Sequence, residues 1–431
     1  MASGENRAVA DKASPSPVAF LLKNLNFGGT QKVLVRLANQ FHEMGYPVDV
    51  LLCGEDGPLR DEVAEGIRLI DLPRSSMLRA RFDAIKAAEG GLGALLLPLI
   101  LPFNPPKSLP SLAGLSSYLT TCKPRALFSG STNQNVLAAL AKRQAHSDVR
   151  LILTEHVNST QRRLDSRKFR HRFLPQAMRE VYRHANAIVG VSRSVSDDLA
   201  TLLNVPREKI RSIYNPSVPA HVDELAARPV DHPWFAEGAK PVFLSAGRLG
   251  RVKDYSTMLR AFASIKDRCD ANLLLLSSAK GGHKQQRRLQ ELNALALELG
   301  VEDRFQIHEF VDNPFAYMSR AAAFVLSSRT EGFGNVIAEA LACGCPVAST
   351  ATRGPGEILG DGLYGKLVPI GDSSALGEAM LQTLNEGADA QALRERGLLF
   401  TNELAAKRYE ETMLAEQAEP VLAGATPEPA C

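Results

Sequence analysis

One pattern, a short apolar strand followed by a helix-like segment, recurs along this chain in two separate sets. The apolar runs Val18–Leu22 and Val48–Leu52 flank an amphipathic segment at 31–44, which predicts a β-α-β unit. Further strands of this set are expected at 126–129, 151–154 and 187–191. After a polar, Pro-rich stretch at 215–233 the pattern restarts, with strands expected at 242–245, 272–276, 304–307, 323–326 and 346–348. The chain is therefore predicted to fold into two α/β domains with parallel sheets, joined near 215–233.

Size and composition agree with two soluble domains. The chain has 431 residues, of which 45% are hydrophobic, enough for two cores of ordinary domain size. A net charge of only +3 argues against nucleic acid as the main partner. The six cysteines form no C-x-x-C pair, so we expect neither a disulfide framework nor a zinc site, and a reducing cytoplasm as the compartment. The polar ends, residues 1–17 and 417–431, are predicted to be disordered tails.

A glycine-rich loop in the second set holds the strongest functional signal. Glu331 and Glu339 lie eight positions apart, and Gly332 and Gly334 precede a helix expected to begin near Asn335. Glycines allow a close approach of the backbone to a ligand, and the free N–H groups of a helix N-terminus favour an anion. The two carboxylates can accept hydrogen bonds from different hydroxyls of one ligand. The alternative is that both are solvated acids favoured by the helix dipole.

Two cations follow the first strand of the same set. Arg248 and Lys253 lie five positions apart in the segment 247–254, directly after the strand expected at 242–245. An Arg fork and a compact Lys charge suit a diphosphate, whose developing negative charge is stabilised best by cations already in place. The same residues on an ordinary surface would simply face water.

The first set contributes a glycine pair and a histidine. Gly28 and Gly29 follow the first strand and His156 follows the strand at 151–154, so both features fall at the carboxyl ends of strands, where parallel sheets carry their sites. No G-x-G-x-x-G fingerprint is present, which disfavours a nicotinamide enzyme. Two glycines can mark only a turn, and a lone histidine after a strand is more often structural than catalytic.

These motifs together resemble a known family. The run 331–339 resembles the E-x7-E motif of the retaining family-4 glycosyltransferases, and the run 247–254 resembles that family's G-R-L-x-x-x-K-D motif. The resemblance extends over about residues 20–384. It implies the GT-B fold, in which two Rossmann-like, doubly wound domains face one another across a cleft. The expected division is an acceptor-binding domain at 18–215, a nucleotide-sugar domain at 216–400, and a terminal helix at about 401–416 that packs back on the first domain.

The resemblance also implies roles for the site. Glu331 would contact the donor sugar, Glu339 the ribose, and Arg248 and Lys253 the diphosphate, with His156 beside the sugar. The donor-binding residues implied are Gly28, Gly29, Gly332, Phe333, Gly334, Asn335 and Glu339. The family needs no metal and no cofactor, and the leaving phosphate is thought to take the acceptor proton. In one departure, residues 277–284 replace the family's G-x-G-P turn, which leaves the choice of sugar nucleotide open.

We therefore expect a retaining glycosyltransferase that moves a sugar from a nucleoside diphosphate, with UDP the expected nucleotide, to a glycan or lipid-linked acceptor in cell-surface polysaccharide or glycoconjugate synthesis. The alternatives are a GT-B sugar-nucleotide epimerase and a non-catalytic sugar-nucleotide-binding subunit. The stretch 162–183 contains seven Arg and one Lys, and the apolar run 91–103 is broken by prolines and too short to span a bilayer. Both suggest peripheral contact with an anionic membrane, on its cytoplasmic face. The alternatives are that 162–183 is a solvated helix face over a core stripe and that 91–103 is part of the core.

Overall fold

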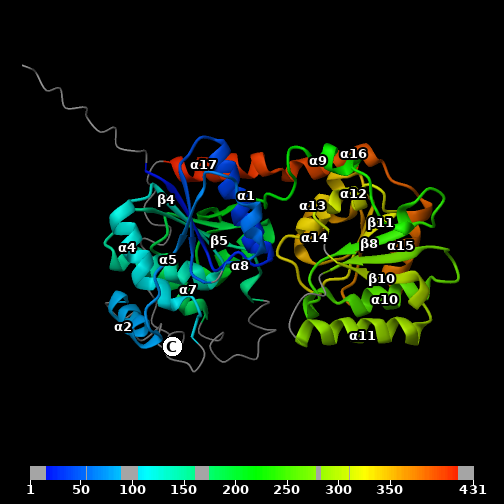
Figure 1. The fold of residues 1–431 in the computed structure, drawn as a ribbon, viewed down its shortest axis with the longest axis horizontal. Helices are drawn as coiled ribbons and strands as arrows, with labels where there is room; N and C mark the ends of the chain where they lie inside the picture. Colours follow the sequence, from blue (N-terminus) through cyan, green and yellow to red (C-terminus); the bar gives the residue numbers. More distant parts are fainter. Residues whose placement is uncertain are drawn as a thin grey trace, which may run out of the picture.

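The protein consists of two parallel-sheet α/β domains, one at each side of Figure 1. The structure is a computed structural model that describes residues 16–54, 56–88, 105–160, 174–277, 283–309 and 311–415. Each sheet is covered by helices on both faces, the doubly wound arrangement. The expected GT-B class is confirmed.

The sheet of the first domain has seven parallel strands in the order β3-β2-β1-β4-β5-β6-β7. Their bounds are Val18–Leu22 for β1, Val48–Leu52 for β2, Arg68–Asp71 for β3, Ala126–Gly130 for β4, Arg150–Glu155 for β5, Ala187–Gly190 for β6 and Ile210–Ser212 for β7. Strands β3 and β7 were not predicted from the sequence. Both are edge strands of three or four residues with mixed burial, so neither shows the apolar run of a central strand.

Helices cover both faces of this sheet. They are α1 (Gly29–Glu43), α2 (Met77–Ala87), α4 (Leu112–Cys122), α5 (Thr132–Gln144), α7 (Leu174–Tyr182) and α8 (Arg193–Leu203). The apolar residues of α1, the segment predicted to be amphipathic, are largely buried, and one of them, Phe41, lies against Phe20 and Phe128. The rings of Phe20 and Phe128 stack at 4.9 Å between the adjacent strands β1 and β4.

The sheet of the second domain has six parallel strands in the order β10-β9-β8-β11-β12-β13. The strands are β8 (Val242–Ala246), β9 (Asn272–Leu276), β10 (Phe305–His308), β11 (Ala323–Leu326), β12 (Val347–Thr350) and β13 (Lys366–Val368). The helices are α9 (Val222–Ala227), α10 (Tyr255–Ser264), α11 (His283–Leu299), α12 (Pro314–Met318), α13 (Asn335–Ala342), α14 (Arg353–Ile358), α15 (Ser373–Asn385) and α16 (Ala390–Gly397). The strand order reverses between β8 and β11, which places a switch point at their carboxyl ends.

The last helix, α17 (Asn402–Leu414), runs along the top of Figure 1 from the second domain to the first. Tyr409 on α17 is fully buried and lies edge-on to Phe128, with 6.0 Å between ring centroids. The stretch at 215–233, expected to be a linker, is only partly one. It contains α9, which packs on α12, because Val222 and Ala226 bury an apolar face there.

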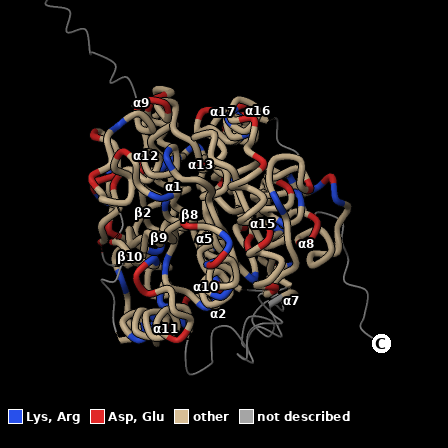
Figure 2. Tube along the Cα trace, turned by 90° about the vertical axis from the view of Figure 1, so that its right-hand side faces the viewer, with Lys and Arg blue, Asp and Glu red and all other residues tan. Residues whose placement is uncertain are grey.

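Both segments expected to contact a membrane fall mainly outside the described residues, namely all of 91–103 and the part of 162–183 before residue 174. The described remainder forms α7, whose Met178, Val181 and Tyr182 are buried in the core of the first domain. Among the described helices, none is both long and apolar enough to cross a bilayer. Figure 2 shows Lys and Arg interspersed with Asp and Glu over both domains, in keeping with the small net charge.

Candidate active site between the two domains

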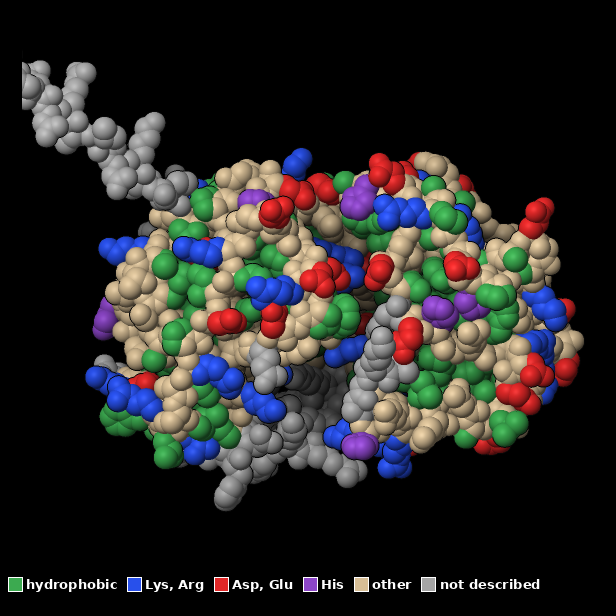
Figure 3. All heavy atoms as spheres, viewed as in Figure 1, with side chains coloured by type: hydrophobic (Ala, Val, Ile, Leu, Met, Phe, Trp, Pro, Cys, Tyr) green, Lys and Arg blue, Asp and Glu red, His purple; other side chains and the backbone are tan. Residues whose placement is uncertain are grey.

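The sequence motifs meet where the carboxyl ends of the two sheets face each other. The first domain contributes Gly28, which precedes α1, and His156, which follows β5. The second domain contributes the loop after β8, with Arg248 and Lys253, and the loop after β11, with Glu331. Figure 3 shows a hollow between the domains with basic and acidic side chains on its rim.

Lys253 and Glu331 form an ion pair at the base of this site. Lys253 Nζ lies 2.7 Å from Glu331 Oε1, and Ser328 Oγ donates to the same oxygen at 2.8 Å. The two side chains are 23% and 16% exposed, so each keeps a path to solvent. The two loops are also joined through the backbone, where Arg329 N–H donates to Val252 O at 2.8 Å. A cation and a carboxylate are thus held side by side in two adjacent loops of the second domain.

Two glycines determine how the loop after β11 reaches helix α13. Gly334 has φ +105°, a left-handed conformation that favours glycine, and it is the N-cap of α13, which begins at Asn335 as predicted. Gly332 packs on the first domain so closely that a Cβ there would lie 2.1 Å from the carbonyl oxygen of His156. The loop therefore presents free N–H groups at a helix N-terminus while it touches the opposite domain.

His156 is held in one neutral form by its neighbours. Thr154 Oγ1 donates its single proton to Ser129 O at 3.1 Å, so at 3.0 Å it accepts from the Nε2–H of His156. Burial lowers the pKa of His156 to about 4. Nδ1 is buried and lacks a hydrogen-bond partner among the described residues. At neutral pH this nitrogen is an unprotonated hydrogen-bond acceptor.

Glu339 lies on α13 and pairs with a residue of the first domain. Arg36 Nη2 on α1 lies 3.1 Å from Glu339 Oε1. The same guanidinium donates from Nη1 to the carbonyl oxygens of Pro216 and Ser217, at 3.0 and 2.8 Å, where the chain crosses between the domains. Oε2 of Glu339 has no partner among the described residues and is the oxygen left for a ligand hydroxyl.

Further contacts hold the domains together around the site. Ser192 Oγ donates to Gly332 O at 2.7 Å, and the backbone N–H of Arg193 donates to both oxygens of Glu357 at 2.9 and 3.0 Å. Glu357 thus lies at the N-terminus of α8, where the helix dipole favours a carboxylate. The structure therefore shows the domains in direct contact at the site.

Aromatic packing fixes the same region. Phe333 is buried, and its ring lies 5.6 Å from Tyr214 and 5.5 Å from Phe400, centroid to centroid. Since the ring of Phe333 faces this cluster, only its backbone is available for the donor-binding role predicted for it. Arg248, the second cation predicted for the diphosphate, differs from Lys253. Its side chain is exposed and forms no ion pair among the described residues.

The structure brings two pairs of the predicted residues into contact, and the roles of all the predicted residues stay predictions. Gly332 meets His156, and Lys253 meets Glu331, whereas Glu339 is engaged by the first domain. Sequence reasoning missed the residues that connect the domains, which are Arg36, Ser192, Tyr214, Glu357 and Phe400. Glu357 lies within residues 20–384, which resemble the family. No sequence motif marks its partner, the backbone N–H of Arg193 at the start of α8.

Comparison with known proteins identifies both halves of the chain. Residues 27–217 match the model of the family described as Glycosyltransferase Family 4, and residues 231–399 match that described as Glycosyl transferases group 1. A lipopolysaccharide core biosynthesis glycosyltransferase of Rhizobium meliloti, LpsE, is 32% identical over 220 residues, which are 50% of this chain and 59% of that protein.

A second relative comes from Campylobacter jejuni. This protein, an N-acetylgalactosamine-N,N'-diacetylbacillosaminyl-diphospho-undecaprenol 4-alpha-N-acetylgalactosaminyltransferase, is 28% identical over 246 residues, which are 57% of this chain and 62% of that one. The match thus spans about three fifths of the length of each of these relatives.

Solved structures with the same fold cover nearly the whole chain. Anabaena HepE in complex with UDP has a TM-score of 0.70 at 18% identity, over 92% of this chain and 99% of that one. WaaG, a glycosyltransferase involved in lipopolysaccharide biosynthesis, has a TM-score of 0.65 at 15% identity, over 92% and 100% of the two chains. At such identities the likeness establishes the fold alone.

Proposed function

Because this chain belongs to glycosyltransferase family 4 and has the GT-B fold, we propose that it transfers a sugar from a UDP-sugar to a hydroxyl of a glycan or lipid-linked acceptor. The proposed transfer retains the configuration of the anomeric carbon and needs no metal. The observation that carries the proposal is the Lys253–Glu331 pair, since Glu331 directly precedes Gly332, the glycine that packs against His156 of the first domain. Lys253 supplies a positive charge for a diphosphate, and the adjacent Glu331 supplies a hydrogen-bond acceptor for sugar hydroxyls.

Each group has a task in the proposed reaction. Arg248 and Lys253, with the free N–H groups near Asn335, stabilise the departing diphosphate. Glu331 accepts hydrogen bonds from the donor sugar, and Glu339 accepts them from the ribose. The bond between the anomeric carbon and the phosphate oxygen breaks, and the acceptor oxygen bonds to that carbon on the same face.

The acceptor proton in this reaction passes to the departing phosphate oxygen, so the step needs no protein base. The neutral state of His156 fits this assignment, because a histidine with a pKa of about 4 is a weak proton acceptor at neutral pH. We give its Nδ1 the task of orienting a sugar hydroxyl.

The relatives guide the choice of substrates. HepE structures hold UDP and UDP-glucose, and relatives are named for lipopolysaccharide core biosynthesis and for transfer to a diphospho-undecaprenol-linked sugar. We propose by analogy a UDP-sugar donor, a lipid-linked or glycan acceptor in cell-surface polysaccharide synthesis, and a peripheral position on the cytoplasmic face of the membrane.

Incubation with UDP-, GDP- and ADP-sugars, with and without EDTA, tests the proposal. Slow release of UDP that is unaffected by EDTA, with an α-configured product from an α-configured donor by NMR, is the expected result. Interconversion of the sugar nucleotide would instead identify an epimerase. Binding without turnover would identify a non-catalytic subunit, and loss of activity in EDTA would refute metal independence.

A further inference from the structure

Helix α2 turns its large apolar side chains toward solvent. Leu78, Phe82 and Ile85 follow the i, i+4, i+7 spacing of one helix face, and they are 77%, 63% and 40% exposed. The opposite face, which packs on the domain, consists of small side chains and one acid, namely Ala80, Asp83, Ala84 and Ala87. A helix that only covers a core buries its large apolar side chains, whereas α2 exposes them. An exposed apolar stripe of this kind indicates an interaction surface.

Cations surround this stripe. Residues 72–88 contain four of them, Arg74, Arg79, Arg81 and Lys86, against the single carboxylate of Asp83. This short segment thus has a net charge of +3, equal to that of the whole 431-residue chain. Asp83 is buried and its carboxylate accepts from Arg79 Nε at 3.0 Å, so its charge is screened from the exposed face.

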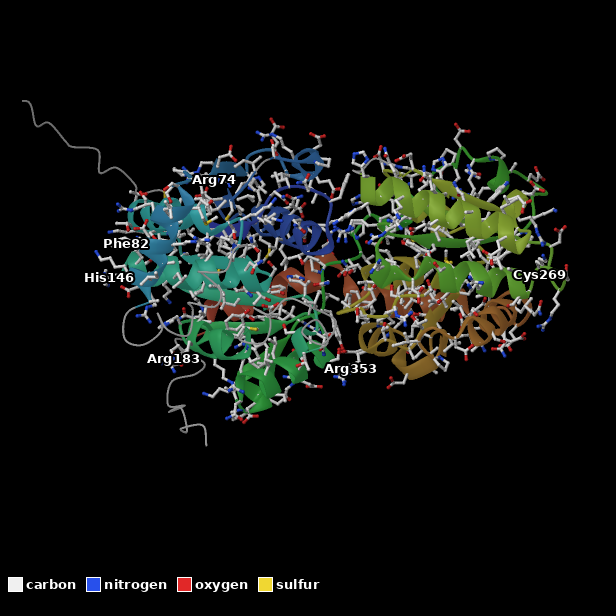
Figure 4. All side chains as sticks on the ribbon, turned by 90° about the horizontal axis from the view of Figure 1, so that it is seen from below. Arg74, Phe82, His146, Arg183, Cys269 and Arg353 are labelled. Atoms are coloured by element: carbon white, nitrogen blue, oxygen red, sulfur yellow. The ribbon has the colours of Figure 1, made fainter. Side chains whose placement is uncertain are left out.

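A basic groove of about 660 Å³ adjoins the helix. Its polar and charged lining comprises Asp83, Lys86, Lys142, Arg143, Gln144, His146, Ser147, Arg183 and His184. Figure 4 shows Arg74, Phe82, His146 and Arg183 at one end of the first domain, far from Cys269 of the second.

Two cations of the groove form hydrogen bonds with neighbouring side chains. Lys142 Nζ donates to Asn186 Oδ1 at 2.9 Å, and Arg143 Nη1 donates to His184 Nε2 at 3.0 Å. Burial and the neighbouring cations lower the pKa of His184 to about 4, so this ring stays neutral. Arg183 is paired with Glu180 at 3.4 Å, whereas the side chain of Lys86 at the edge of the groove is exposed.

We propose that the α2 surface, defined as Leu78, Phe82 and Ile85 with Arg74 and Lys86, docks on an anionic phospholipid bilayer. The apolar stripe enters the headgroup region, and the cations and the basic groove contact lipid phosphates. A narrow apolar stripe enclosed by positive charge matches a bilayer, which offers hydrocarbon below a layer of anions. This proposal rests on the peripheral membrane position proposed above and names the surface that docks, and it does not depend on which donor or acceptor is used.

Vesicle sedimentation of the full chain tests this surface. Wild type should sediment with phosphatidylglycerol-containing vesicles at low salt, be released at high salt, and ignore pure phosphatidylcholine. A Leu78→Gln, Phe82→Gln, Ile85→Gln variant should bind about tenfold or more weakly. An Arg74→Gln, Lys86→Gln variant should lose roughly 25-fold, since each cation contributes about 1 kcal/mol, or about fivefold, at such a surface.

Matched controls come from the second domain. Leu297→Gln with Leu363→Gln removes apolar side chains that are 66% and 77% exposed, and Lys284→Gln with Arg287→Gln removes two exposed cations of α11. These variants should bind vesicles like wild type. Equal losses in the α2 and control variants, or no binding by wild type, would overturn the proposal.

Two further measurements distinguish a bilayer from a second copy of this chain as the partner of α2. Tryptophan at position 82, through Phe82→Trp, should be quenched by brominated lipid, and tryptophan at position 297, through Leu297→Trp, should not. A dimer in sedimentation equilibrium that the α2 variant dissociates, without vesicle binding, would show that a second copy covers the stripe instead. UDP release from the soluble donor should be unchanged in the α2 variants, so failure of docking is distinguishable from failure of the transfer reaction.

Discussion

Arg36 on α1 and Glu339 on α13 form an ion pair between the two domains, with 3.1 Å between Nη2 and Oε1. Their side chains are 12% and 9% exposed, so water screens the pair little. Arg36 also binds the carbonyl oxygens of Pro216 and Ser217, and thereby joins the crossing segment to both domains. The position of the carboxylate assigned to the ribose therefore depends on how the domains are closed.

Replacing Arg36 should weaken donor binding. In Arg36→Gln, Glu339 loses its charged partner while it stays buried, and removing one member of a buried pair costs up to about 3–5 kcal/mol. We expect the KM for the donor to rise about tenfold, with a smaller change in kcat and a lower Tm. Arg60→Gln, which breaks an exposed pair with Asp56, is the control. An unchanged donor KM would show that the pair does not position Glu339.

The cations after β8 should matter more for turnover than for folding. Loss of a charge contact to the departing diphosphate costs on the order of 2–4 kcal/mol, so Lys253→Ala and Arg248→Ala should each lower kcat about a hundredfold or more. Arg251→Ala, in the same loop, removes another exposed cation and should act like wild type. Wild-type turnover in a folded double variant of Arg248 and Lys253 would remove the diphosphate assignment.

Replacing Glu331 and replacing Glu339 should affect different steps, turnover in the first case and nucleotide binding in the second. Glu331 contacts Lys253 and Ser328 within the second domain, whereas Glu339 lies on α13 with one oxygen open to a ligand. We expect Glu331→Gln to lower kcat more than the affinity for UDP, and Glu339→Gln mainly to weaken UDP in calorimetry. Glu298→Gln, exposed on α11, should change neither. Equal weakening of UDP binding by both variants would show that these roles are wrongly divided.

Gly332→Ala should disturb the contact between the domains. The new Cβ would lie 2.1 Å from the carbonyl oxygen of His156, a backbone atom that has no rotamer by which to move away. We expect a larger radius of gyration in small-angle scattering and a loss of turnover greater than about tenfold. Gly356→Ala meets only a side-chain oxygen of Asp361 at 3.7 Å and should leave both unchanged. An active, equally compact Gly332→Ala would contradict this.

Acid should destabilise the fold through two histidines. The pKa values of His156 and His184 are lowered to about 4 by burial, against 6.5 for an ordinary histidine. The unfolded chain therefore binds more protons between these values, and the free energy of unfolding falls as pH drops from about 6.5 toward 4. Denaturant unfolding should show this slope reduced in His156→Gln and His184→Gln but unchanged in His221→Gln, whose ring is exposed. A pH-independent wild type over this range would refute it.

Local sequence signals located the central strands, because strands buried on both faces need continuous apolar runs. Four predicted strands, β1, β2, β9 and β11, have the predicted bounds. The glycine-rich loop and the start of α13 were also predictable from the local sequence. Gly334 occupies a left-handed conformation directly before the helix, which favours glycine at that position. The edge strands β3, β7 and β13 lacked such a signal and were not predicted, because they are short and partly exposed.

The sequence by itself determined the two α/β domains, the loops with their charges and glycines, and the family that these features resemble. Only the tertiary structure decided which groups meet across the domains. Arg36 and Glu339 are 303 positions apart and Ser192 and Gly332 are 140 apart, far beyond the reach of any local pattern. The outward face of α2 was likewise decided by packing, because the small side chains fit against the domain and leave Phe82 and its neighbours to solvent.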